Sequence, residues 1–277
     1  MGLRINTNTQ SLRAQSAMSK VEMQKSDSMA KLSSGTRINK AGDDAAGLAI
    51  SEKLKANIRG SQQATRNAGD GISLIQTAEG GLNETSNILI RLRELSVQAA
   101  SDTVGDTERG FADLEFQHLT KEVDRIAAST QFNGKQLLTG QGDDMEFQIG
   151  IMNDANNDRL AYKPKDSSAK TSDLGIEGLS VQSKVNAQEN LEKIDNAING
   201  VNGNRASLGA LQNRLQSTIS NLETRTENLA AANSRIRDTD VASESAELAK
   251  ANILSAASTS VLSQANSSGS GALKLIG

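Results

Sequence analysis

An unbroken heptad pattern over residues 191–236 constrains this chain more than any other feature. Apolar residues recur there at alternating spacings of three and four, which places them along one side of a single helix. At a rise of about 1.5 Å per residue such a helix is roughly 65 to 70 Å long, so it needs partner helices of similar length. The pattern predicts an elongated antiparallel helical bundle or coiled coil. Its seam comprises Leu191, Ile194, Ile198, Val201, Leu208, Leu215, Ile219, Leu222, Leu229 and Ile236.

Four polar residues interrupt this seam, and all of them occupy the same heptad position. They are Arg205, Gln212, Thr226 and Asn233. Polar residues at one seam position fix helix register or partner number at some cost in stability. We therefore expect the long helix to have a specified alignment with its partners.

The composition excludes several classes of function. The chain of 277 residues is 2% aromatic, which disfavours a conventional large globular core, and it has no Cys and one His. Disulfide scaffolds, thiol nucleophiles and multi-histidine metal centres are excluded on that basis. The formal net charge of -3 provides no basic field for nucleic acid or anionic membrane, and no window approaches the roughly 18 apolar residues of a membrane span. We expect a protein without a cleaved export signal, either cytoplasmic or exported uncut.

The N-terminal half supplies the partner helices. An apolar stripe predicts a helix over residues 44–101, and a second, shorter helix begins with Asp106 or Thr107 as its N-cap and ends at the turn Phe132-Asn133-Gly134. Together with the long helix they predict a three-helix core. The main stripe of the first helix comprises Leu54, Ile58, Ala68, Ile72, Ile75, Leu82 and Leu89.

The middle of the chain carries a different pattern around the single proline, Pro164. Met145, Phe147 and Ile149 alternate with polar residues, residues 153–158 favour a turn, and the alternation resumes at Leu160. This predicts a small β-hairpin. Residues 165–178 have no sustained period and are expected to form an exposed link, so that hairpin and link occupy about 140–184 at the tip of the molecule.

The two ends are predicted to be helical arms of similar length, 1–42 and 236–277, around a bundle of 43–235. The first arm opens with a capping box, Thr7 with Gln10, and breaks at Ser33-Ser34-Gly35, whereas the second is rich in alanine. Alanine and serine bury little apolar area, so a pair of such arms can barely offset its ordering entropy. We expect the arms to be disordered alone and to fold on binding, as befits a subunit of an assembly.

Long stretches of the sequence resemble bacterial flagellin. They include KLSSGTRINKAGDDAAGLAISEKLKANIRG at 31–60, QATRNAGDGISLIQTAEGGLNETSNILIRLRELSVQAA at 63–100, EVDRIAASTQFNGKQLL at 122–138, RASLGALQNRLQSTISNL at 205–222 and SRIRDTDVASESAELAKANIL at 234–254. The resemblance implies a structural subunit of the helical flagellar filament, secreted and used for motility. It further implies that the arms line an inner tube and the bundle forms an outer tube. The ending SSGSGALKLIG departs from the family pattern, and its glycines should lower helicity over 267–271.

The resemblance also implies partners for the arms. They are copies of the chain itself, sister flagellins in the same filament, and the cap and hook-filament junction proteins. The type III export apparatus of the flagellum would deliver the chain, and an export chaperone would hold the C-terminal arm. The positions expected to contact the chaperone or the inner core are Leu248, Ile253, Val261 and Leu262.

A second implied surface lies on the bundle. Arg91, Leu95 and Glu115 match the flagellin surface read by the animal Toll-like receptor for flagellin. Leu95 points roughly 120° away from Leu89 and only about 40° from Arg91, so we expect it at the margin of the apolar stripe, where it can anchor a partner. The same face is expected to contact the next subunit. A solvated Arg91–Glu115 pair and an inner seam Leu95 are the simpler alternative.

No motif in the chain predicts catalysis, a cofactor or a metal site. Residues 154–158 imitate a calcium loop, but the sixth position is Arg159 instead of Gly and the twelfth is Lys165 instead of Glu, which leaves a plain turn. His118 has no second histidine, and Asp43-Asp44 fits helix capping. Three hypotheses remain: a filament subunit, a flagellar hook-filament junction protein of related build, and an enzyme with its active site in the acidic tip. No specific sequence feature supports the enzyme.

Overall fold

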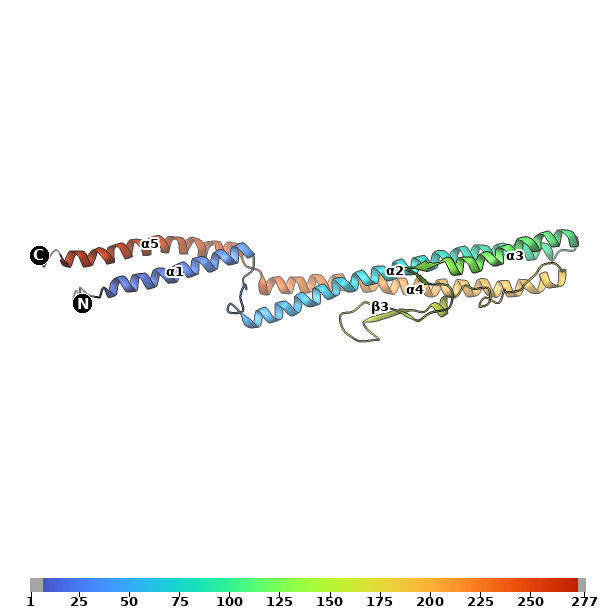
Figure 1. The fold of residues 1–277 in the computed structure, drawn as a ribbon, viewed down its shortest axis with the longest axis horizontal. Helices are drawn as coiled ribbons and strands as arrows, with labels where there is room; N and C mark the ends of the chain where they lie inside the picture. The colour runs from blue at the N-terminus through green and yellow to red at the C-terminus, as the bar shows by residue number, and fades with distance from the viewer. Residues whose placement is uncertain (1–6, 274–277) are drawn as a thin grey trace. The chain divides into compact units, whose positions relative to one another are not determined.

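The computed structural model describes residues 7–273, with side chains through Ser267. It is mainly α-helical, as predicted, and its described helices are α1 (Thr9–Ser34), α2 (Ala45–Ala99), α3 (Asp106–Ser129), α4 (Lys184–Arg237) and α5 (Val241–Leu273) (Figure 1). The chain divides into two compact units, one comprising the residues up to Ala56 and from Asn228 onward, the other Asn57–Glu227. Both dividing points fall inside the long helices α2 and α4.

In the first unit, α1 and α5 pack along each other (Figure 1). The residues that face the partner helix follow a heptad spacing on both sides. On α1 they are Ser11, Ala14, Met18, Val21, Lys25, Ser28 and Leu32, and on α5 they are Glu244, Leu248, Ala251, Ser255, Ser258, Leu262 and Ala265. Spacing of this kind defines a two-stranded coiled coil, but one whose seam is mostly small or polar.

Local signals set the ends of these helices. Gly35 adopts φ 69° as the left-handed C-cap of α1, and the N-cap is Asn8, whose side chain accepts from the backbone N of Ser11. The predicted capping box at Thr7 was therefore one residue early. Beyond Gly35, the two connecting segments bind each other, since the backbone N of Arg37 donates to the carbonyl of Arg237 at 2.6 Å. The predicted loss of helicity over 267–271 is not found, because α5 continues to Leu273.

In the second unit, α2, α3 and α4 form the predicted three-helix core. Leu82, Leu89 and Leu92 of α2, Phe116 of α3 and Ile194 of α4 are fully buried. The observed bounds of α2 and α3 lie within two or three residues of the predicted ones.

The predicted capping role of the Asp43-Asp44 pair is confirmed. The Oδ1 atom of Asp44 accepts from the backbone N of Gly47 at 2.8 Å, at the start of α2. The Oδ2 atom of Asp43 accepts from the backbone N of Asn39 and of Lys40, both at 2.9 Å. The two carboxylates therefore hold the backbone at the entry to the helix.

The heptad seam of α4 is confirmed. Within the bundle, one heptad position is buried at every repeat, by Ile194, Val201, Leu208, Leu215 and Leu222. The alternate position, which carries Arg205 and Gln212, is only half-buried. Polar groups are tolerated there because their ends reach solvent or a partner: Arg205 lies 3.9 Å from Glu79 of α2.

The predicted hairpin is also present. Strands β3 (Met145–Gln148) and β4 (Arg159–Tyr162) are antiparallel, with Met145 opposite Tyr162 and Gln148 opposite Arg159. A second, smaller hairpin of β1 (Gln131–Phe132) and β2 (Lys135–Gln136) surrounds the predicted turn, where Asn133 and Gly134 both have positive φ. Two consecutive residues at positive φ are the conformation of a tight hairpin turn.

The expectation of an exposed link over 165–178 is wrong. The segment begins with a short 3-10 helix, η1 (Pro164–Ser167), and then packs on α3, with Ala169 and Ile176 fully buried. Thr171 donates from its backbone N and its hydroxyl to Asp124 of α3, at 3.0 and 2.9 Å. The absence of a sequence period did not mean exposure, because isolated apolar residues and side-chain hydrogen bonds hold irregular backbone against a helix.

Candidate assembly surfaces

The α1–α5 pair buries very little. Among its described seam residues, Ser28, Ala251 and Ala265 are buried, whereas the larger apolar residues at seam positions are only half-buried. Away from the seam, several large apolar side chains are exposed to solvent. They are Leu12, Met23 and Met29 on α1, and Val241, Ile253, Leu254 and Val261 on α5. This unit therefore carries more large apolar side chains outside than inside, which marks an interaction surface.

The four residues predicted on the C-terminal arm divide between these two sides of α5. Leu248 and Leu262 face α1 at seam positions, whereas Ile253 and Val261 are 70% and 59% exposed. The outward pair can contact a partner while α1 and α5 stay together. Leu248 and Leu262 become available only when α5 leaves α1.

Arg91 and Glu115 are brought together across α2 and α3. The guanidinium donates to Glu115 at 2.9 Å and to Glu94 on its own helix at 2.9 Å. The hydrogen bond to Glu115, and then that to Glu94, raise the pKa of Arg91 above its ordinary value, and all three side chains are about half exposed. The pair is thus a solvated ion pair on an open face.

The predicted exposure of Leu95 is wrong. Its side chain is 2% exposed and belongs to the core between the helices. The angular argument placed it correctly at the margin of the Leu89 stripe, but α3 covers that margin because it packs on the same side of α2 as Arg91. Leu95 lies in the core beneath the Arg91–Glu115 face, so it cannot contact a partner unless α2 and α3 repack.

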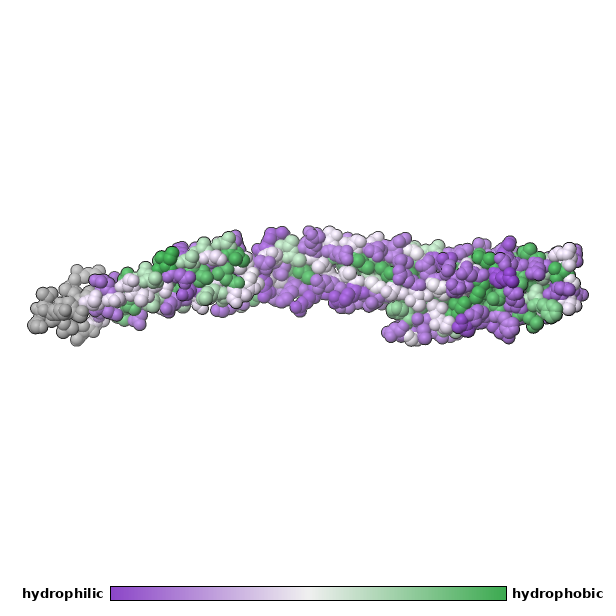
Figure 2. Space-filling model, turned by 90° about the horizontal axis from the view of Figure 1, so that it is seen from above, coloured by the Kyte–Doolittle hydropathy of each residue, from purple (hydrophilic) through white to green (hydrophobic). Residues whose placement is uncertain are grey.

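Other apolar residues are exposed on the same two helices. Ile90 and Val97 of α2 are 46% and 49% exposed, and Phe111 and Leu114 of α3 are 68% and 60% exposed. Figure 2 shows exposed hydrophobic residues scattered among hydrophilic ones on the face that it presents. The sequence contained a signal for the exposure of Ile90 and Val97, since both fall outside the apolar stripe predicted for residues 44–101.

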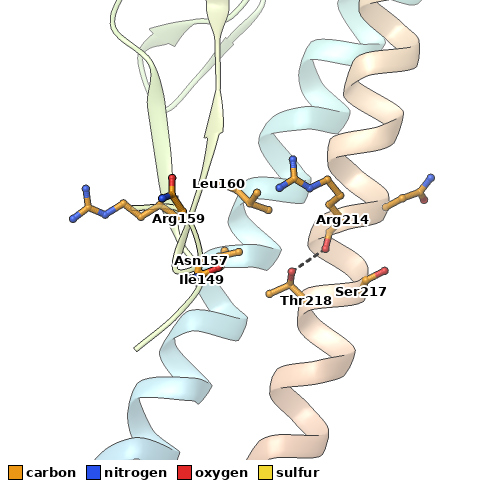
Figure 3. Close-up of a pocket in the computed structure, with 9 residues that line it drawn as sticks. Ile149, Asn157, Arg159, Leu160, Arg214, Ser217 and Thr218 are labelled. Carbon is orange, nitrogen blue, oxygen red and sulfur yellow. Dashed lines mark hydrogen bonds between the residues drawn. The ribbon is translucent and has the colours of Figure 1, made fainter. Parts of the chain in front are cut away.

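A hollow of about 440 Å³ lies between the β3–β4 hairpin and α4 (Figure 3). Ile149 and Leu160 form an apolar floor and Arg214 reaches from α4 toward the hairpin, whereas Arg159 points away from the hollow.

Among the described residues, no helix is long and apolar enough to cross a membrane, and no three His, Cys, Asp or Glu side chains gather as metal ligands would.

Both halves of the chain match known protein regions. The bacterial flagellin N-terminal helical region matches residues 5–143, and the C-terminal helical region matches residues 191–276. The chain belongs to the bacterial flagellin family. Within that family it is 46% identical to a flagellin of Halalkalibacterium halodurans, with 98% of this chain and 99% of the relative aligned.

Two further relatives place this flagellin among filament proteins. The flagellar filament 33 kDa core protein of Treponema phagedenis is 40% identical, with 98% of this chain and 99% of the relative aligned. The crystal structure of Bacillus cereus flagellin is similar with a TM-score of 0.50 and 35% identity, covering 61% of this chain and 94% of that chain. The Halalkalibacterium and Treponema relatives each align with 98% of this flagellin, and neither favours a junction protein.

Proposed function

We propose that this flagellin polymerises by burying the outward apolar residues of α1 and α5 against the same helices of neighbouring subunits. As a flagellin, it is a structural subunit of the extracellular filament of the bacterial flagellum. The observation that supports this route is the apolar distribution of the α1–α5 pair: its buried seam residues are Ser and Ala, its larger seam residues are only half-buried, and further Leu, Met, Ile and Val side chains are exposed outside the seam. In a filament, neighbouring subunits supply the apolar contacts that the α1–α5 helices of an isolated subunit lack.

The same distribution makes the arms weakly ordered before assembly. At about 25 cal/mol per Å² of buried apolar surface, a seam whose buried residues are Ser and Ala and whose larger residues are half-buried can barely offset an ordering cost of about 1–2 kcal/mol per residue. The arms of the monomer should therefore exchange quickly with the disordered state and become fixed only in the filament. Arms that fold on binding prevent premature polymerisation at low subunit concentration.

Hydrogen exchange on the dilute monomer tests this proposal. Amides of residues 10–30 and 245–262 should exchange at least about 100-fold faster than amides in the middle of α2, because local opening there costs little free energy. Deletion of residues 240–277 should abolish filament growth seen by electron microscopy without lowering the helix content of the bundle. Protected arms in the monomer, or filaments from the shortened chain, would contradict the proposal.

The arms also suit delivery by the flagellar type III export apparatus. A chain without cysteine, whose ends fold weakly, can be threaded unfolded, and an export chaperone that covers α5 would keep it from polymerising early. Leu248 and Leu262 are then bound together with Ile253 and Val261, because α5 is free of α1. The cap, the hook-filament junction proteins and sister flagellins would meet the same arms at the ends of and within the filament.

Titration calorimetry of α5 with its export chaperone tests whether the chaperone contacts the outward side of the helix, the side that faces α1 in the monomer, or both. Ile253→Asp and Leu248→Asp should each weaken binding about tenfold or more if the chaperone wraps the helix, since each places a charge in an apolar contact. Lys250→Asp is a matched control on the same turn. Indifference to both apolar changes would refute the assignment.

Recognition by the Toll-like receptor for flagellin is proposed for the open face of α2 and α3. Arg91 and Glu115 supply its charge, and the exposed Ile90 and Phe111 replace Leu95 as candidate anchors. Arg91→Ala and Glu115→Ala should each reduce signalling by the monomer without changing its helix content. Full signalling by the double variant would exclude this surface.

A further inference from the structure

One of the two arginine side chains that line the hollow beside α4 forms no ion pair with any described residue. Arg159 is paired, because its guanidinium lies 3.2 Å from Glu146 and also contacts Asn153. Arg214, in contrast, has no ion pair with any described residue and extends over the floor formed by Ile149 and Leu160 (Figure 3). No carboxylate is among the described residues that line this hollow. Its chemistry is that of an apolar floor with an unpaired guanidinium above it.

The hollow continues along α4 on the other side of Arg214. A second space of about 340 Å³ lies between β4 and α4, shares Arg214, and reaches Ser207. Asp166 also lines this second space, but it forms no ion pair with Arg214. Together the two spaces follow α4 from Ser207 to Thr218, which is about three helical turns or roughly 16 Å. A shallow groove of that length fits a segment of helix better than a small molecule, which needs a more enclosed site.

A complementary surface is present at the start of α3. Phe111 and Leu114 are 68% and 60% exposed, and Glu108 lies one turn before Phe111. Glu108 forms no hydrogen bond or ion pair with another described residue, whereas Glu115 is already bound to Arg91. The face therefore combines two large apolar side chains with a carboxylate that has no ion pair among the described residues, which complements the apolar floor and the unpaired Arg214 of the first space.

A filament requires such a pair of unlike surfaces. Helical polymers grow through head-to-tail contacts, in which one surface of a subunit binds a different surface of the next. We propose that the β4–α4 groove receives the α3 face of a second copy of this chain, with Arg214 binding the carboxylate of Glu108 and Phe111 resting on the apolar floor. This inference rests on the proposed function, since it assigns one contact within the same polymer.

A charge-swap experiment tests the contact. Arg214→Glu and Glu108→Arg should each raise the critical concentration for seeded filament growth about tenfold or more, because each leaves like charges opposed in the interface. The double variant that carries both substitutions restores opposite charges in every contact and should recover most of the loss. Arg225→Glu on α4 and Thr107→Arg on α3 are matched controls that should have little effect, and urea unfolding of each monomer checks that the bundle is intact.

The outcomes separate this inference from the function on which it rests. If the unchanged chain forms no filaments on seeds, the proposed function fails. If the unchanged chain does form filaments, three results would each show that the proposed contact is wrong: normal growth of Arg214→Glu, no recovery in the double variant, or equal impairment by the control substitutions. Normal growth combined with phosphate binding that is lost in Arg214→Glu would assign the hollow to a small anion and likewise overturn the docking.

Discussion

At the scale of single residues, a buried carboxylate of α3 holds the irregular segment that leads into α4. Asp113 is 6% exposed and accepts from the backbone N of Val181 at 2.8 Å and from the side chain of Gln182 at 3.0 Å. Burial alone raises the pKa of a carboxyl group, but these hydrogen bonds outweigh burial, so the pKa of Asp113 lies below its ordinary value of 3.8. The charged form is therefore the one that stabilises the fold.

Replacing this carboxylate should destabilise the bundle in a pH-dependent way. Asp113→Ala should lower the free energy of unfolding at pH 7 by about 1–3 kcal/mol, because a buried backbone N–H loses its acceptor. Because the folded pKa is depressed, the stabilisation is present above the unfolded pKa and is lost as the pH falls through the folded pKa. The deficit of the variant should therefore shrink below about pH 4.

Urea unfolding followed by circular dichroism at pH 7 and at acidic pH measures this difference. Asp143→Ala removes a solvent-exposed carboxylate and should leave stability nearly unchanged at both values. A deficit that is the same at every pH would show that Asp113 contributes through its shape and not its charge.

At the scale of elements, two adjacent glycines of α2 have opposite surroundings. A Cβ on Gly81 would lie 2.6 Å from both Leu138 and the hydroxyl of Thr130, so this glycine lets the segment after α3 approach the helix closely. A Cβ on Gly80 would meet nothing within 4 Å. The sequence Gly80-Gly81 alone does not tell them apart.

Alanine substitution should separate these roles. Gly80→Ala should stabilise the chain by about 0.5–1 kcal/mol through helix propensity, whereas Gly81→Ala should destabilise it by about 1–3 kcal/mol because the new methyl overpacks the contact with Leu138. The midpoint of urea unfolding for each variant gives the sign directly. Equal effects of the two substitutions would show that the segment can move away from α2 at no cost.

At the scale of the whole molecule, the large core lies within one of the two units. Every residue of the main buried cluster, from Ala68 to Leu215, falls inside Asn57–Glu227. A fragment of residues 57–227 should therefore fold alone, unfold cooperatively in urea with the fluorescence and dichroism signals coincident, and fail to form filaments. A fragment that is unfolded, or that unfolds without cooperativity, would show that the arms contribute to the core.

The sequence alone predicted the helices, their approximate ends, the α4 seam and the β3–β4 hairpin. These features follow from local physical causes: heptad spacing, strand alternation, the fixed backbone of proline and the left-handed freedom of Gly35. It also predicted arms whose seam is too poor in apolar area to hold a pair tightly. Resemblance to flagellin, and not spacing, pointed to Arg91 and Glu115.

Tertiary structure decided which surfaces are free. Leu95 is buried because α3 covers the margin of its stripe, and the segment over 165–178 is packed because Asp124 and an apolar residue such as Ile176 find partners far away in sequence. The packing of β4 beside α4 encloses Arg214 in a hollow where it forms no ion pair with a described residue. Periodicity specifies the direction in which a side chain points from its own helix, but exposure depends on what other elements occupy that direction, and that is settled by packing between residues distant in sequence.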